Sequence, residues 1–248
     1  MIARISIIAG LALGFCPVAS LAAEPTAPTI TLSLGGGDPK ALPLTLQIVA
    51  LMTVLSLAPA LVIMVTSFTR ILIVLSFTRS ALGAQQVPPN MVLAGIALFL
   101  TIFTMAPVWQ QVNDSALQPY LKQEISYQTA AERAIKPVRA FMLRQTDESE
   151  LALFVRLGKL PRPTSSDDIP TYAVIPAFMV GELKHAFTMG FMIFIPFVVI
   201  DLVVATILMS MGMMMMPPVV ISLPCKILLF VLVDGWSVIT QSLVASFN

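Results

Sequence analysis

Two long apolar stretches in the last third of the chain contain or adjoin five charged residues, Glu182, Lys184, Asp201, Lys226 and Asp234. Their side chains could bind ions, transfer protons or form ion pairs. A charge near the centre of a bilayer costs roughly 3 kcal/mol or more, so such side chains should face protein or water rather than lipid. Buried acids and bases of this kind can form a path for ions or protons. They can also pair with one another and so specify how helices assemble.

The spacing of these charges favours assembly over an ion path. Glu182 and Lys184 are two positions apart, so they do not face each other on a helix. We expect Lys226 to pair with Glu182, within one subunit or between subunits. Asp234 follows Lys226 by eight residues, about 12 Å along a helix, which is too far for a direct bond. No apolar stretch carries the series of acids or histidines that would indicate a proton path.

A cluster of methionines separates the same two apolar stretches. Six of the 15 methionines lie within residues 209–216, directly before Pro217 and Pro218. Methionine is unbranched and flexible, so the cluster could fill gaps in a core or form an apolar loop in the membrane. If copies of the loop surround one axis, they would instead form a deformable apolar gasket. Such a gasket could exclude ions and yield to a passing polypeptide.

The sequence offers little for catalysis, and we predict that the protein is not an enzyme. Its single histidine, His185, makes a multi-histidine metal site within one chain impossible. A metalloprotease helix needs a second histidine four residues away. The glycines at 35–37 are not followed by the Lys-Ser/Thr pair of a phosphate loop. We therefore expect no catalytic residues, no bound metal and no cofactor.

The elements that would position these residues are the helices of a membrane protein. Of the 248 residues, 57% are hydrophobic and only 11% are charged, and the mean hydropathy is +0.91. A soluble domain carries about 25% charged residues. The net charge of +1 gives no reason to propose a nucleic acid partner. Of the two cysteines, Cys16 lies in a segment that we expect to be removed, so no internal disulfide is predicted.

Composition divides the chain into five segments. We predict a secretory signal peptide at 1–23, where Arg4 precedes a short apolar core and small residues; a short membrane anchor is the alternative. The other predicted segments are a flexible linker at 24–43, a first pair of hydrophobic helices at 44–109, a periplasmic helical region at 110–173, and a second hydrophobic pair with the methionine-rich loop at 174–248.

The two hydrophobic pairs contain four apolar runs that could each cross a membrane, but other signals argue against simple lipid-facing spans. The sequence Ser-Phe-Thr-Arg occurs twice and ends at Arg70 and at Arg79, which point to opposite faces if the helix is continuous. Both can be positive-inside anchors, or one can meet a partner subunit. We count Arg70 among the buried charges. Pro196 and Pro224 interrupt the later apolar runs, and such prolines favour helices that pack within protein.

The polar region carries its own helix signals. Pro137 predicts a helix start, Asp147 an N-cap and Gly158 a C-cap. Phe141 and Phe154 could pack a hairpin within the chain, or they could hold one subunit to the next.

Several long strings resemble the FliP family of subunits of the flagellar type III export gate. The resemblance covers roughly residues 44–248. The strings are SFTRILIVLSFTRSALGAQQVPPNM (67–91), IPAF (175–178), GELKHAF (181–187), FIPFVVIDLVVATILMSMGMMMMPP (194–218) and ISLPCKILLFVLVDGW (221–236). Their length and unusual composition make the match specific. The signal and linker favour the flagellar members over their injectisome relatives, which usually lack both.

The resemblance implies an all-α fold of membrane-associated helical hairpins that assemble into a helical ring. FliP copies would form this ring with FliR and an outer layer of FliQ. FlhB and FlhA would act with it, and FliO would aid assembly. The complex would stand in the inner membrane at the flagellar basal body, displaced toward the periplasmic side. It would conduct unfolded flagellar proteins and have no enzymatic activity of its own.

The resemblance also implies roles for particular residues. It assigns an inter-subunit salt bridge to Glu182 and Lys226, and assembly contacts to Phe141 and Phe154. It assigns the pore gasket to the methionine loop, Met211, Gly212, Met213, Met214, Met215 and Met216.

Two other classes of function remain open on the residues alone. An ion or small-solute transporter subunit predicts paired discontinuous helices in inverted repeats and a charged site at the bilayer midplane. The sequence shows no internal repeat. An intramembrane enzyme would need a nucleophile–base pair or a metal set, and the residues offer neither.

Overall fold

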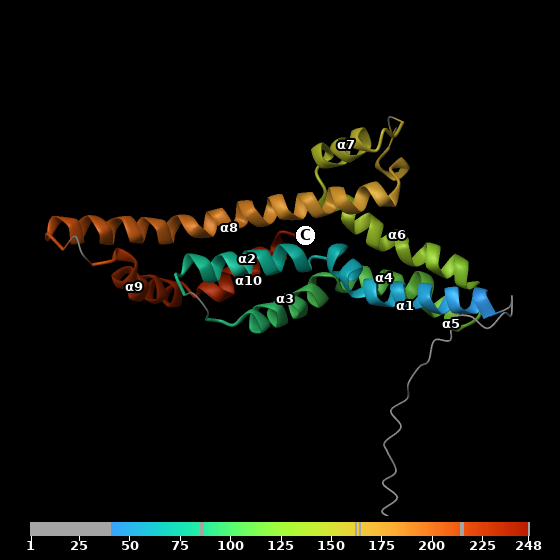
Figure 1. The fold of residues 1–248 in the computed structure, drawn as a ribbon, viewed down its shortest axis with the longest axis horizontal. Helices are drawn as coiled ribbons and strands as arrows, with labels where there is room; N and C mark the ends of the chain where they lie inside the picture. Colours follow the sequence, from blue (N-terminus) through green and yellow to red (C-terminus); the bar gives the residue numbers. More distant parts are fainter. Residues whose placement is uncertain (1–40, 85–86, 162, 164, 214–215, 248) are drawn as a thin grey trace, which may run out of the picture. The chain divides into compact units, whose positions relative to one another are not determined.

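The computed structural model describes residues 41–248 except 85–86, 162, 164, 214–215 and 248. The predicted signal peptide and nearly all of the predicted linker lie outside the described residues. The regular elements of the described residues are all helices, without a strand among them (Figure 1). This confirms the predicted all-α fold.

The chain divides into two compact units, Met1–Met52 and Thr53–Asn248, and the division falls inside α1 (Ala41–Met64). Of the first unit, only the helical residues 41–52 are described. Helix α1 contains no charged residue, and its side chains from Leu46 to Met64 are mostly exposed. A helix that is apolar on every side needs lipid or another protein around it.

The second unit is organised around α2 (Phe68–Ala81), which runs alongside α8 (Thr171–Ser210) (Figure 1). Its buried residues Ile71, Val74, Leu75 and Thr78 recur at the spacing of one helical face. This face forms a first hydrophobic core with α3 (Asn90–Thr104), α8, α9 (Pro218–Leu232) and α10 (Gly235–Ala245).

A second core lies where the polar region packs on the first part of α8. It is formed by α4 (Ala106–Val112), α6 (Tyr127–Gln145), α7 (Glu148–Leu157) and α8, with Phe178 at its centre. The π-helix η1 (Asn113–Leu117) and the short α5 (Gln118–Leu121) link α4 to α6, and the 3-10 turn η2 (Ser166–Asp168) leads into α8.

The helix signals of the polar region are confirmed in part. Helix α7 has Asp147 as N-cap and Gly158 as C-cap, as predicted, although the Asp147 side chain makes no capping hydrogen bond. The predicted helix start at Pro137 is wrong, because Pro137 lies inside α6. The start is at Ser126, whose hydroxyl accepts a hydrogen bond from the Thr129 amide. The N-cap hydrogen bond and the amphipathic face of α6 stabilise the helix more than Pro137 disrupts it.

Helix length separates α8 from the other apolar helices. Its 40 residues, without a break at Pro176 or Pro196, extend for about 60 Å, roughly twice the hydrocarbon thickness of a bilayer. Among the described helices, α8 alone could cross a membrane by length and apolar composition. Three pairs, Ile48–Met64 with α2, α3 with residues 106–121, and α9 with α10, pass the same test together but are bent by 55° to 63°.

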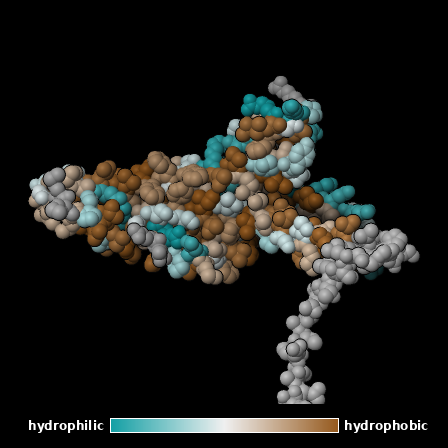
Figure 2. Space-filling model, viewed as in Figure 1, coloured by the Kyte–Doolittle hydropathy of each residue, from teal (hydrophilic) through white to brown (hydrophobic). Residues whose placement is uncertain are grey.

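The surface of these helices is largely apolar. Figure 2 shows brown, apolar residues along most of α8, whereas teal, hydrophilic residues gather over α7. Phe187, Phe191, Met192 and Leu202 of α8 are each more than half exposed. Such a surface marks contact with lipid or with other proteins.

Candidate functional site: buried ion pairs and the methionine loop

Arg70, in the first turn of α2, is buried against Glu182 of α8, and both side chains are almost completely inaccessible. The Arg70 Nε donates to Glu182 Oε2 at 3.0 Å, and its Nη2 donates to the other carboxylate oxygen. Two parallel bonds from one guanidinium form the strongest kind of ion pair in proteins. The prediction that Arg70 is buried is therefore confirmed.

The remaining donors of Arg70 hold the end of the chain. Its Nη1 donates to the backbone oxygen and the hydroxyl of Ser246 at 3.0 and 3.1 Å, and Nη2 donates to Gln145 Oε1 at 3.2 Å. The guanidinium carbon lies 4.1 Å from the centre of the Phe247 ring, within the range of a cation–π interaction. One arginine thus connects α2, α6, α8 and the residues after α10.

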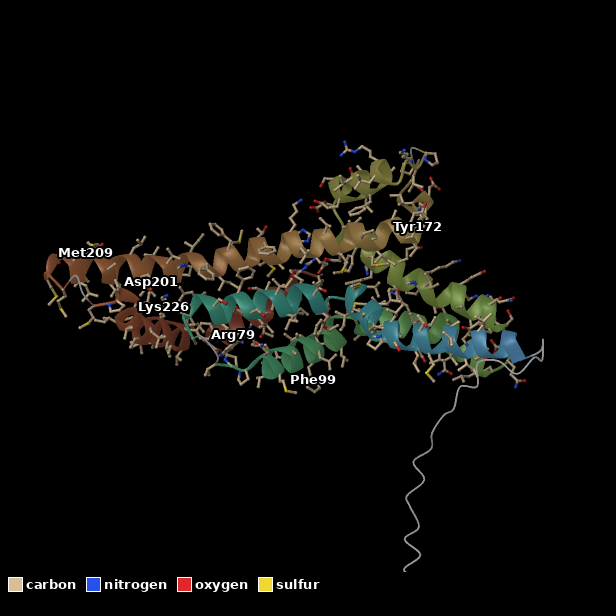
Figure 3. The ribbon with its side chains drawn as sticks, in the orientation of Figure 1. Arg79, Phe99, Tyr172, Asp201, Met209 and Lys226 are labelled. Carbon is tan, nitrogen blue, oxygen red and sulfur yellow. The ribbon has the colours of Figure 1, made fainter. Side chains whose placement is uncertain are left out.

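Lys226 of α9 has a different partner from the one predicted. Its Nζ donates to Asp201 Oδ2 at 2.6 Å and to the backbone oxygen of Ala81 at 3.4 Å. Ser222, one turn earlier on α9, donates to the other oxygen of Asp201. Figure 3 shows Asp201 and Lys226 beside each other between α8 and α9.

The expected pairing of Glu182 with Lys226 is therefore wrong for a single subunit. Asp201 follows Glu182 by 19 residues of one unbroken helix, which separates the two carboxylates by about 28 Å. Lys226 pairs with Asp201, and Arg70 pairs with Glu182. The same pairing between subunits is untested and stays a prediction.

Lys184 and Asp234 are exposed and Asp201 is one-third exposed, contrary to the prediction that all three are buried. Lys184 is half exposed and bonds Asp147 and Glu150 at 2.9 and 3.0 Å, at the start of α7. The turn of α8 that carries Lys184 faces the polar region, where water and the carboxylates at the start of α7 surround its amine. Asp234 is exposed at the bend between α9 and α10.

Two acids that bond Lys184, Asp147 and Glu150, have lowered pKa values. The hydrogen bond from Lys184 is the main reason that the pKa of Asp147 lies below its usual value. The pKa of Glu150 is also lowered, first by a hydrogen bond from Ser149 and then by Lys184. Both carboxylates therefore stay ionised in the folded protein at neutral pH.

The methionine loop begins with a defined turn at the end of α8. Gly212 has φ +76°, and its amide donates to Met209 O at 3.1 Å, while the Met213 amide donates to Leu208 O at 3.0 Å. This pair of bonds is a Schellman motif, which requires a left-handed residue and so favours glycine. Met209, Met211, Met213 and Met216 are all exposed; Met214 and Met215 lie outside the described residues.

Exposure of the loop limits the interpretations of the cluster. These four methionines do not fill the core of their own subunit. The interpretation as a gap-filling core is therefore wrong for them. An apolar loop in the membrane and a gasket around an axis both remain.

The two aromatic residues assigned to assembly differ in exposure. Phe141 is only 3% exposed and packs against Phe178 and Phe247, with ring centres 5.9 and 6.3 Å apart. It holds α6 to α8 within the chain, rather than packing α6 on α7 as a hairpin. Phe154 on α7 is half-buried at the edge of the same core. A contact between Phe154 and another subunit stays a prediction.

The sequence identified most of the charged residues of this site but not several of their partners. It did not connect Arg70 with Glu182, although both had been singled out. It missed Asp147 as a partner of Lys184, and it gave Ser246 and Phe247 no role. The charge of Asp147 was a usable signal, whereas nothing in the local sequence marks the last residues as ligands of Arg70.

Comparison with known proteins places the chain among flagellar proteins. The profile of the FliP family matches residues 51–243. The chain is 52% identical over 246 residues to the flagellar biosynthetic protein FliP of Caulobacter vibrioides, covering 99% of the chain and 91% of that protein. It is 53% identical over 210 residues to the FliP protein of Bacillus subtilis, covering 85% of the chain and 95% of that protein.

Proposed function

The chain belongs to the FliP family, and we propose that it is the pore-forming core subunit of the flagellar protein export gate in the bacterial inner membrane. Copies of the chain surround an axis, and unfolded flagellar proteins pass along this axis. The methionine loop closes the pore to ions between passages. No catalytic step is assigned to the chain.

The exposed methionine loop is the observation that carries this proposal. A flexible apolar side chain that leaves its own core is available to close a gap formed by several subunits. The Schellman turn at Gly212 fixes where the loop leaves α8. The start of the loop is therefore defined, while the methionine side chains can adapt to a polypeptide of changing shape.

The apolar surface supports assembly within the membrane. Exposed apolar side chains cover α1, α3, α8 and α9, far more than one folded subunit would leave to water. The length of α8 exceeds the hydrocarbon layer by about 30 Å. This excess supports a complex that rises above the bilayer on the periplasmic side, where the hydrophilic α7 region would lie.

The proposed partners follow the family. We assign the lateral surface of the ring to further copies of the chain, FliR and FliQ. FlhB and FlhA act with the ring, and FliO assists its assembly. The inter-subunit Glu182–Lys226 bridge is one way to hold neighbouring copies. It would require both residues to exchange their partners Arg70 and Asp201 on assembly.

The test replaces Met211, Met213 and Met216 together with alanine in cells that depend on this chain for export. The matched control replaces Met192, which is 65% exposed on α8 but lies outside the loop. Loss of the loop methionines should raise the ion conductance of the inner membrane while flagellar proteins are still exported. The control should leave conductance unchanged. Equal conductance in both variants would remove the gasket from the proposal.

A transporter of ions or small solutes is the second candidate, because its expected broken helices have counterparts in the three bent pairs. However, Glu182 and Asp201 are both ion-paired, so neither is a free acid at the centre of an apolar stretch. A transporter should lose uptake when a charged residue changes and should tolerate the loop substitutions. The same conductance experiment therefore separates the two candidates.

A further inference from the structure

The acidic and basic residues of the apolar segments leave one charge of each sign without a counter-ion. Segments 68–104 and 186–245 contain five such residues: Arg70, Arg79, Asp201, Lys226 and Asp234. Arg70 pairs with Glu182, and Lys226 pairs with Asp201. Among the described residues, no ion pair involves Arg79 or Asp234. A charge on an apolar surface needs a counter-ion when lipid or another protein covers that surface.

Asp234 is held in an unusual conformation at the bend between α9 and α10. Its φ and ψ are +49° and +54°, in the left-handed region that few residues other than glycine adopt. It occupies the N-cap position of α10, yet its carboxylate makes no capping hydrogen bond. An aspartate at this position normally caps the helix, so the free carboxylate is available to a group outside the chain.

The residue after Asp234 fixes this bend. A Cβ atom at Gly235 would lie 2.3 Å from the ring of Phe230, so only glycine fits there. Phe230 also packs edge-on against Trp236, with ring centres 5.2 Å apart. The bend is therefore rigidly specified. Around the carboxylate, Leu232 and Val233 are more than half exposed.

Arg79 lies at the end of α2, beside the start of α3 (Figure 3). Its Nη1 donates to Asn90 Oδ1 at 2.6 Å and to Pro88 O at 3.2 Å. These neutral acceptors orient the guanidinium but do not neutralise it. The neighbouring Val87 and Met91 are 71% and 87% exposed. Arg79 is thus an oriented cation with an exposed apolar border, the counterpart of Asp234.

We propose that Arg79 of one copy of this chain forms an ion pair with Asp234 of the neighbouring copy. The inference rests on the proposed ring of copies and names one contact that holds it. In a head-to-tail interface, two different patches of the same chain meet, so opposite charges on separate patches are self-complementary. A lipid phosphate could neutralise Arg79 but would repel Asp234. A second copy neutralises both, and the apolar borders exclude water from the pair.

Cross-linking between differently tagged copies tests the contact directly. Both native cysteines are first replaced, as Cys16→Ser and Cys225→Ser. Arg79→Cys is then placed in one tagged chain and Asp234→Cys in the other, and the two are co-expressed in membranes and oxidised. The expected product is a dimer that carries both tags. A control pair that combines Arg133→Cys, at an exposed position of α6, with Asp234→Cys should give none. Absence of the mixed dimer from an intact oligomer would overturn the inference.

Charge exchange supplies a second measurement. Arg79→Asp or Asp234→Arg alone should weaken assembly at least about 30-fold, the lower end of the effect when a buried interfacial charge loses its partner. The double variant Arg79→Asp/Asp234→Arg should recover most of the oligomer, which also shows that the altered chains fold. Unchanged assembly in both single variants would overturn the inference, as would failure of the double variant to recover.

These outcomes also separate the inference from the proposed function. If the unaltered chain assembles but is indifferent to these charges, the ring stands and only this contact is wrong. If the unaltered chain stays monomeric when it is co-expressed with its partners, both are wrong. If Arg79→Cys/Asp234→Cys in one chain forms an internal disulfide within an intact oligomer, the pair belongs within a subunit, which also overturns the inference.

Discussion

Replacing Arg70 with methionine should destabilise the folded subunit strongly, because it leaves a carboxylate without a counter-ion in the interior. Glu182 is completely buried, and Arg70 is 2% exposed. In the variant, Glu182 retains no cation among the partners described around it. The substitution also removes the donors that bind Ser246 and Gln145.

The expected magnitude follows from this burial. Removing one partner of a buried ion pair costs about 3–5 kcal/mol, whereas replacing both partners with apolar residues is often close to neutral. We therefore expect Arg70→Met to lower the free energy of unfolding by about 3–5 kcal/mol. Adding Glu182→Leu should restore at least about 2 kcal/mol of that loss, although the acceptors at Ser246 and Gln145 stay unpaired.

The measurement is reversible unfolding of the purified chain in detergent, followed by far-UV circular dichroism during titration with a denaturing detergent. Lys184→Ala is the matched control. Lys184 lies two residues from Glu182 on the same helix and forms ion pairs too, but its side chain is 52% exposed. Water can reach Lys184 and Asp147 once their pair is broken, whereas Glu150 is only 11% exposed. The control should therefore lose much less stability than Arg70→Met.

Two results would refute this reasoning. Equal effects of Arg70→Met and Lys184→Ala would mean that burial does not determine the strength of these pairs. A double variant that is no more stable than Arg70→Met would mean that the cost comes from lost packing around the arginine rather than from the unpaired charge of Glu182. The double-variant cycle separates these contributions because both residues are in direct contact.

Two further predictions concern packing and pH. Gly190→Ala places a Cβ atom 2.7 Å from the Phe77 ring, so it should destabilise the contact of α2 with α8 by about 1–3 kcal/mol. The loss should appear as a lower melting temperature. The control Gly95→Ala, where no atom lies within 4 Å of the added Cβ, should have little effect. The lowered pKa of Asp147 means that its ion pair with Lys184 stabilises the folded state above the unfolded pKa of about 3.9 and is lost as pH falls through the lower folded value. After correction for the intrinsic pH dependence of exchange, amide hydrogen exchange at the start of α7 should therefore accelerate at strongly acidic pH. Lys184→Ala should abolish this acceleration. Corrected exchange rates that do not change with pH would contradict a stabilising Asp147–Lys184 pair.

The helices were predictable from sequence where their signals are local. Apolar composition predicted the hydrophobic helices, and the N-cap at Asp147 and C-cap at Gly158 gave the ends of α7 correctly. Pro137 was misleading, because a proline is tolerated inside a helix that is stabilised by packing, and α6 packs against α4 and α8. The continuity of α8 through Pro196 has the same origin: its neighbours support it on one side.

The site was predictable in its residues but not in its pairs. A charge in an apolar run is visible in the sequence, whereas its partner depends on which helices lie side by side. Arg70 is 112 residues from Glu182, and it becomes the partner only because α2 packs along α8. The contact of Arg70 with Ser246 depends on α9 and α10 folding back toward α2, which no local pattern encodes.

The buried Arg70–Glu182 pair and the partly buried Lys226–Asp201 pair together fix the register of α2 on α8. Arg70 binds Glu182 in the first turn of α2, and Lys226, held by Asp201, donates to the carbonyl of Ala81 in its last turn. A lysine at that end also complements the negative end of the helix dipole. A shift of α2 by one turn would break the Arg70–Glu182 pair and the hydrogen bond from Lys226 to Ala81. It would leave Glu182 without its cation in an apolar interior, at a cost of several kcal/mol. Apolar packing alone would tolerate such a shift, because the exposed and buried faces of these helices are chemically similar. The ion pairs therefore select one arrangement from several, and the arrangement they select determines where Arg79 is presented.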